Sequence, residues 1–233
     1  MDPIKKRLKV AFRIGGWLGV SWLALNAMGV WAQDTRGQAI AMRGTSNGVA
    51  ACISCHGAHG EGNAATGFPR LAGLSAVYLA SQMTAFASGE RQSPIMQPFA
   101  KLLSAGDRQA VADYFSNLPA PVNTRTEDRV SIAPTQAGAW IATRGRWEQG
   151  VPACVQCHGP GGIGVGSTFP PLAGQPATYI VSQLQGWKKG ARPPGPLALM
   201  PVIASKLSDG DMSAVAAYYA VATDDGKKQG SGK

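Results

Sequence analysis

Two short stretches carry all four cysteines of the 233-residue chain. Residues 52–56 read C-I-S-C-H and residues 154–158 read C-V-Q-C-H. This pattern is typical of covalent c-type haem attachment, because two thiols on one helical turn reach the two vinyl groups of a porphyrin and the histidine faces the iron. A C-x-x-C pair alone would fit a redox dithiol or half of a zinc site. The sequence therefore predicts two covalent haems, attached at Cys52, Cys55, Cys154 and Cys157, with His56 and His158 as iron ligands.

The first 32 residues have the pattern of a secretory signal peptide. Five basic residues and one acidic residue within positions 1–13 precede an apolar segment, and Val30 and Ala32 provide small residues for cleavage after Ala32. Export fits haem attachment, which takes place outside the bacterial cytoplasm, so we expect a periplasmic protein. An uncleaved membrane anchor is the alternative, although the apolar segment of about 17 residues is short for a span.

The basic charge does not indicate nucleic-acid binding. Removing residues 1–32 lowers the formal charge from +9 to +5, and two haems would add about four propionate charges. No basic stripe interleaved with aromatic residues is present. Nucleic acid is therefore not an expected partner.

The remainder of the chain is a tandem repeat with an offset of 101 to 104 residues. F-P-R-L-A-G at residues 68–73 recurs as F-P-P-L-A-G at 169–174, and Y-L-A-S-Q at 78–82 recurs as Y-I-V-S-Q at 179–183. We predict cytochrome domains at 33–119 and 135–223, a proline-containing linker at 120–134 and a disordered tail at 224–233.

Each repeat is expected to be all-α. Helices are predicted over about residues 37–44, 75–88 and from 104 onward, with equivalents over 138–145, 177–188 and from 208 onward. Ser104 and Asp107 are spaced like a capping pair at the start of the last helix. Helix packing is the role expected for Tyr114 and Phe115 and for the equivalent pair Tyr218 and Tyr219, with a propionate contact from one tyrosine in each domain as the alternative.

The second axial ligand of each iron must be found among few residues. The chain has three histidines, so bis-histidine ligation of both haems within one chain is impossible. Met96 lies 44 residues after Cys52 and Met200 lies 46 after Cys154, each in a predicted proline-bearing loop. This pairing favours histidine–methionine ligation over core packing by the methionines. Such ligation fills both axial positions, which favours electron transfer over oxygen chemistry.

Residues around the predicted ligands are assigned as well. The Pro69 and Pro170 carbonyls are expected to accept the second ring N–H of each ligand histidine. His59 has no equivalent in the second repeat and is expected to be a solvated loop residue, with haem tuning or partner docking as the alternative. Arg70, opposite Pro171, is expected either to pair with a haem propionate or to be solvated.

These motifs resemble the dihaem cytochrome c4 family, over about residues 36–223. The resemblance implies two tandem class I cytochrome c domains related by pseudo-twofold symmetry, and a periplasmic electron carrier that is soluble or membrane-associated. It also implies the axial pairs His56–Met96 and His158–Met200. His59 and the proline run at residues 193–196 depart from the family pattern.

Three functions are weighed. The first is an electron carrier between a donor dehydrogenase or quinol-oxidising complex and a terminal oxidase. The second is a dedicated cytochrome subunit of a periplasmic or membrane-bound dehydrogenase. The third is a dihaem enzyme such as a peroxidase or thiosulfate dehydrogenase, which would need an open iron or a cysteine ligand; the sequence offers no spare cysteine.

Overall fold

The computed structural model describes residues 36–120 and 136–220, and these residues form helices and loops without a named strand. The all-α prediction is confirmed. The predicted leader at 1–32, all but Ala120 of the predicted linker, and the predicted tail at 224–233 lie outside the described residues. Within the described ranges, no helix has the length and apolar character needed to cross a membrane.

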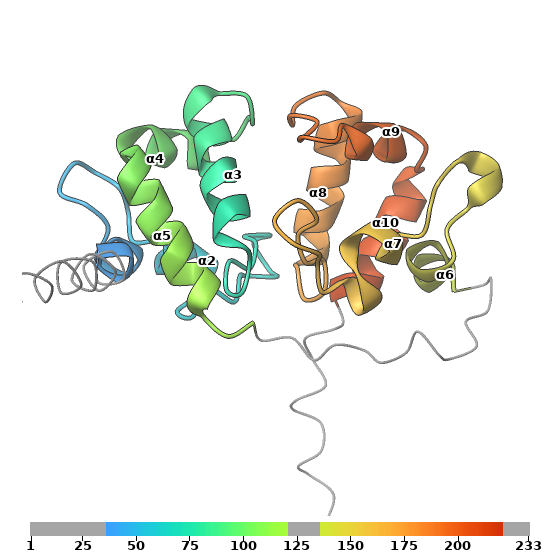
Figure 1. Ribbon diagram of the computed structural model, residues 1–233, viewed down its shortest axis with the longest axis horizontal. Helices are drawn as coiled ribbons and strands as arrows, with labels where there is room; N and C mark the ends of the chain where they lie inside the picture. The colour runs from blue at the N-terminus through green and yellow to red at the C-terminus, as the bar shows by residue number, and fades with distance from the viewer. Residues whose placement is uncertain (1–35, 121–135, 221–233) are drawn as a thin grey trace, which may run out of the picture.

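The two repeats contain the same succession of helices (Figure 1). In the first, helical residues 36–43 are followed by α2 (Ile53–His56), α3 (Ala76–Ser88), α4 (Met96–Leu102) and α5 (Ala105–Asn117). In the second, α6 (Ala137–Thr143) is followed by α7 (Val155–His158), α8 (Ala177–Lys188), α9 (Leu199–Ser205) and α10 (Asp209–Ala220). The short 3₁₀ turns η2 (Trp147–Gln149) and η3 (Pro160–Gly162) flank α7.

Helices α4 and α9 correct the prediction that both paired methionines lie in loops. Met96 is the first residue of α4 and Met200 is the second residue of α9. The nearby prolines suggested loops, but Pro98 and Pro201 occupy the first turn of each helix, where the missing N–H has no intrahelical partner to lose. The Ser93 hydroxyl accepts the Met96 N–H at 3.0 Å, whereas α9 follows Ala198 in the left-handed conformation with φ of 50°.

Each repeat is held together by a close crossing between its first and last helices. Gly37 lies against the Ala110 carbonyl of α5, and Gly138 lies against the Ala214 carbonyl of α10. On the last helices, Phe115 and Tyr219 are each 1% exposed and pack against Gly60 and Gly162 of the loops after the C-x-x-C-H motifs. This confirms the packing role assigned to Phe115 and Tyr219, and it fixes the motif loops against the last helices.

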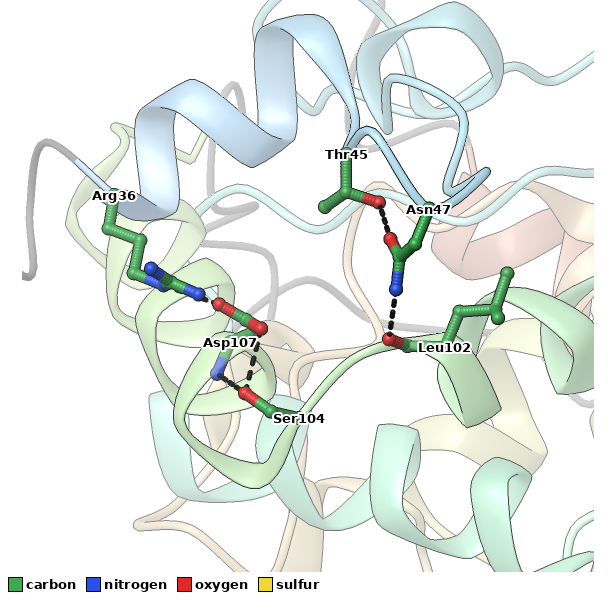
Figure 2. Close-up of polar contacts among 6 residues, drawn as sticks. All are labelled: Arg36, Thr45, Asn47, Leu102, Ser104 and Asp107. Carbon is green, nitrogen blue, oxygen red and sulfur yellow. Dashed lines mark hydrogen bonds and ion pairs between the residues drawn. The ribbon is translucent and has the colours of Figure 1, made fainter.

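Polar contacts tie the segment before the first C-x-x-C-H motif to the α4–α5 junction (Figure 2). The Asn47 amide donates to the Leu102 carbonyl at 3.1 Å. The Ser104 hydroxyl accepts the Asp107 N–H at 3.1 Å, as the predicted cap requires, and the Asp107 carboxylate is paired with Arg36. The cap recurs at Ser208 in the second repeat.

The two repeats lie side by side, with α3 and α8 facing one another (Figure 1). Hydrogen bonds cross between them, for example from Arg91 to the Tyr179 hydroxyl at 3.1 Å and from Arg192 to the Tyr78 hydroxyl at 2.9 Å. Tyr179 and Arg192 are the repeat equivalents of Tyr78 and Arg91. Interchanging the two repeats therefore turns one contact into the other, as the predicted pseudo-twofold relation requires.

We expect Gly138→Ala to destabilise the protein by about 1–3 kcal/mol, because overpacking at a tight contact costs that much. A Cβ at Gly138 would lie 2.1 Å from the Ala214 carbonyl oxygen. The control is Gly210→Ala in α10, where the nearest atom to an added Cβ is the Ser208 hydroxyl at 3.7 Å. It should be neutral or stabilising by up to about 1 kcal/mol. Guanidinium unfolding of the haem-loaded protein measures the stability of both variants. Equal stability of the two would contradict a close contact between α6 and α10 at Gly138.

We expect Asp107→Asn to remove a pH-dependent part of the stability. The hydrogen bond from Arg36, supported by Ser104, holds the pKa of the Asp107 carboxyl below its ordinary value. The ionised form therefore stabilises the fold above the ordinary pKa, and this contribution is lost as the pH falls through the folded-state pKa. The variant should be less stable by about 1 kcal/mol at pH 7 and equal to the parent at acidic pH. Asp113→Asn, on the same helix, is the control: its carboxylate is bonded to the Gln109 amide rather than to Arg36, so the variant should lose less stability at pH 7.

Candidate haem sites and the interface between them

Each motif histidine is oriented by a proline carbonyl from the F-P-x-L-A-G turn. His56 Nδ1 lies 2.9 Å from the Pro69 oxygen, and His158 Nδ1 lies 2.7 Å from the Pro170 oxygen. A carbonyl only accepts hydrogen bonds, so Nδ1 carries the proton and Nε2 keeps its lone pair for a metal. Burial lowers the pKa of both imidazoles, which favours the neutral, ligating form.

The motif cysteines have the character of attachment residues. None of the four forms a disulfide, and all are partly exposed. Burial raises the pKa of the Cys52 thiol to about 11, and that of Cys154 to about 11 as well. A redox C-x-x-C dithiol is instead typically activated by a lowered pKa. Cys52 and Cys154 thus lack the lowered pKa of an activated dithiol, and the haem assignment rests on the C-x-x-C-H spacing and on the cavity beside each motif.

Each repeat contains a largely apolar cavity beside its motif. The first, of about 400 Å³, is lined by Cys52, Cys55, His56 and Met96 among others. The second, of about 520 Å³, is lined by Cys154, Cys157, His158 and Met200 among others. Both volumes lie in the range of cofactor pockets. The structure thus brings each motif to the same cavity as the methionine paired with it from the sequence.

The two cavities share part of their walls. Five residues at the contact between the repeats line both, namely Leu74, Tyr78, Gln82, Tyr179 and Gln183. All five belong to α3, to α8 or to the turn leading into α3. A molecule bound in either cavity therefore contacts side chains that also face the other cavity.

Two buried arginines lie at this shared wall. Arg91 and Arg192 are 6% and 9% exposed, and they stack on the rings of Phe86 and Trp187 at 4.5 Å and 3.9 Å. Arg91 also donates to Gln183 at 2.5 Å. Among the described residues, neither guanidinium has a carboxylate within ion-pairing distance.

The residues present fit a haem. A porphyrin is an apolar ring with two carboxylates at one edge, and the cavities offer apolar walls with buried cations between them. These arginines were not predicted from the sequence, although they occupy equivalent positions of the repeat, in S-G-E-R at residues 88–91 and K-G-A-R at residues 189–192. A search for paired cations, like the search for paired methionines, would have found them.

Arg70 corrects the alternative that its guanidinium is solvated, while its pairing with a propionate stays a prediction. It is 1% exposed and donates to two equivalent carbonyls, that of Ala72 in its own repeat and that of Ala173 at 3.0 Å in the other. Burial lowers the pKa of this guanidinium to about 10. Arg70 is thus a cross-repeat contact, together with Gln175, which the sequence analysis also missed. His59 is exposed, in agreement with the loop assignment, and lines neither cavity.

Comparison with known families agrees with this geometry. The cytochrome c family matches residues 35–119, and the family described as cytochrome c oxidase, cbb3-type, subunit III matches residues 141–218. Cytochrome c4 of Pseudomonas aeruginosa is 36% identical over 172 residues, covering 73% of this chain and 83% of that protein. The chain belongs to the dihaem cytochrome c4-like family.

Two further relatives are similar to this cytochrome over more of its length. The thiosulfate dehydrogenase electron acceptor of Stutzerimonas stutzeri is 46% identical over 207 residues, 87% of this chain and 92% of that protein. The structure of a thiosulfate dehydrogenase from Marichromatium purpuratum, in its as-isolated form, matches with a TM-score of 0.72 and 42% identity. That match covers 80% of this chain but only 40% of the other.

Several predictions are confirmed at this point. The protein is a tandem cytochrome c with two covalently attached haem c groups, and it is an electron-transfer cytochrome. The thiosulfate dehydrogenase relatives also show that redox proteins are its partners in general terms.

Proposed function

We propose that this cytochrome accepts electrons from a thiosulfate dehydrogenase in the periplasm and passes them to a terminal oxidase. The observation that carries the proposal is the similarity to a named thiosulfate dehydrogenase electron acceptor over 92% of that protein. At 46% identity, this relative is closer than cytochrome c4 of Pseudomonas aeruginosa at 36%. The predicted leader at residues 1–32 supports export.

We further propose that each repeat, at about 33–119 and 135–223, binds one haem between a histidine and a methionine. His56 and Met96 line one cavity, and His158 and Met200 line the other. Such a haem supplies one reversible electron, and its filled axial positions leave no place for a substrate on the iron. This favours a carrier over the peroxidase and thiosulfate dehydrogenase activities that were weighed as alternatives.

A second arrangement has specific support: the chain would be a dedicated subunit that stays bound to its dehydrogenase. In the Marichromatium purpuratum structure, the region similar to this chain is 40% of one longer chain that is named a thiosulfate dehydrogenase. A cytochrome unit joined covalently to another unit in a relative favours a lasting complex here. Co-migration of the two proteins in size-exclusion chromatography separates a lasting complex from a free carrier.

The donor is tested by mixing the oxidised, haem-loaded protein with thiosulfate and a catalytic amount of a purified thiosulfate dehydrogenase. We expect both haems to be reduced in a stopped-flow absorbance trace. Thiosulfate alone and enzyme alone are the controls and should leave the protein oxidised. Reduction no faster than in these controls would contradict the proposed donor, while leaving the electron-transfer function intact.

The axial ligands are tested by Met96→Ala and Met200→Ala, made singly. We expect each variant to lose about half of the weak near-infrared charge-transfer band of methionine-bound ferric haem, because one of two such bonds is removed. The midpoint potential of the affected haem should fall, and its reduced form should bind carbon monoxide. Met212→Ala is the control: Met212 is a fully buried core residue, so its loss should lower stability and leave the band unchanged. If the band is unchanged in either variant, the methionine replaced in that variant is not an iron ligand.

A further inference from the structure

The peptide group between Pro69 and Arg70 makes hydrogen bonds through both of its polar atoms. Its carbonyl oxygen accepts from His56 Nδ1 at 2.9 Å. Its N–H, which belongs to Arg70, donates to Oε1 of Gln175 at 3.0 Å. Nε2 of Gln175 donates back to the Arg70 carbonyl at 3.0 Å. One side chain of the second repeat is thus connected, through a single peptide group, to the motif histidine of the first.

The second repeat has no such connection. His158 Nδ1 is bonded to the Pro170 carbonyl at 2.7 Å. The nitrogen of that peptide group belongs to Pro171, and proline has no N–H. The position equivalent to Gln175 is Leu74, a buried apolar residue that has no acceptor to offer. The two sites share the C-x-x-C-H pattern, but they differ in the hydrogen bonds of the peptide group that holds the motif histidine.

Hydrogen bonds in a chain polarise one another. When the Arg70 N–H is bonded to Gln175, the Pro69 carbonyl becomes a better acceptor for the His56 ring N–H. A stronger bond at Nδ1 makes an imidazole a more basic metal ligand. A more basic axial ligand favours ferric over ferrous iron and so lowers the potential of the haem. Gln175 is 4% exposed and Arg70 is 1% exposed, so water has little access to replace the bond.

We propose that Gln175 is a positioning residue for the other repeat: through the Pro69–Arg70 peptide group it lowers the potential of the haem held by His56. This rests on the axial ligation proposed above. The haem held by His158 lacks this effect. Gln175 thereby contributes to the difference between the two potentials, which helps to determine where an electron resides in the chain.

Gln175 is a more selective probe of this effect than Arg70. The Arg70 guanidinium donates to the equivalent carbonyls Ala72 and Ala173, so its charge lies between the repeats and acts on both haems. Gln175 is uncharged, and its hydrogen bonds to Arg70 involve the backbone of one repeat only. Changing Gln175 leaves the charge of Arg70 in place and alters the hydrogen bonds behind only one motif histidine, His56.

The experiment is Gln175→Met in the haem-loaded, full-length protein. Methionine keeps the length of the side chain and cannot replace the amide bonds. A redox titration followed by NMR resolves the haem methyl resonances of each site. We expect the midpoint potential of the first haem to rise by more than that of the second, whose cavity Gln175 also lines. The Nδ1 proton of His56 should exchange faster with solvent, while that of His158 keeps its rate.

Leu74→Met is the matched control, because it alters the equivalent position, which has no N–H to bind. Leu74 lines both cavities, so any shift that this variant causes should be similar at the two midpoints. A reciprocal variant, Leu74→Gln with Pro171→Ala, gives the second repeat an N–H and an acceptor and should lower the second midpoint. The proposal is overturned if Gln175→Met leaves the first midpoint unchanged or lower, or raises both equally. If the unmodified protein lacks the methionine–iron band, the proposed methionine ligation fails instead. Failure of the Gln175 proposal is therefore distinguishable from failure of the ligation proposal.

Discussion

Each repeat surrounds an apolar space of several hundred cubic ångströms that its own side chains do not fill. A polypeptide of this size buries too little surface to leave such a space empty, so the cofactor completes the core. The helices are arranged accordingly. The first and last helices cross closely at Gly37 and Gly138, and the motif helices α2 and α7 and the methionine helices α4 and α9 then line the space.

The buried arginines are explained by the same need for a cofactor in each cavity. Burying a guanidinium without an anion is unfavourable, yet Arg91 and Arg192 lie at the wall between the two cavities, and Arg70 lies between the two F-P-x-L-A-G turns. The haems carry the carboxylates that these cations can meet. Each of the two arginines at the wall stacks on an aromatic ring of its own repeat, Phe86 or Trp187, and donates hydrogen bonds to the other repeat.

The sequence predicts the parts of this structure that depend on local pattern or on repetition. The C-x-x-C-H motifs, the all-α class, the Ser104 cap and the pairing of Met96 with Met200 follow from spacing alone. The short helices α4 and α9 were missed because a proline in a first turn is indistinguishable from a loop proline without the backbone. The buried state of Arg70 and the bonds of Gln175 were missed because they join residues more than 100 positions apart. Such contacts depend on how the repeats dock, which no local pattern records.

The shared cavity walls bear on how such a protein can arise from a duplicated single-haem unit. Tyr78 and Tyr179 each face both cavities and each accept a bond from the arginine of the other repeat. A separated repeat would expose these tyrosines and leave its partner arginine without them. After duplication, changes on α3 and α8 are therefore constrained in pairs, while the surfaces away from this contact can diverge freely. Unequal divergence, such as Pro171 opposite Arg70, is then a route by which two copies of one ancestral unit acquire different properties within a single chain.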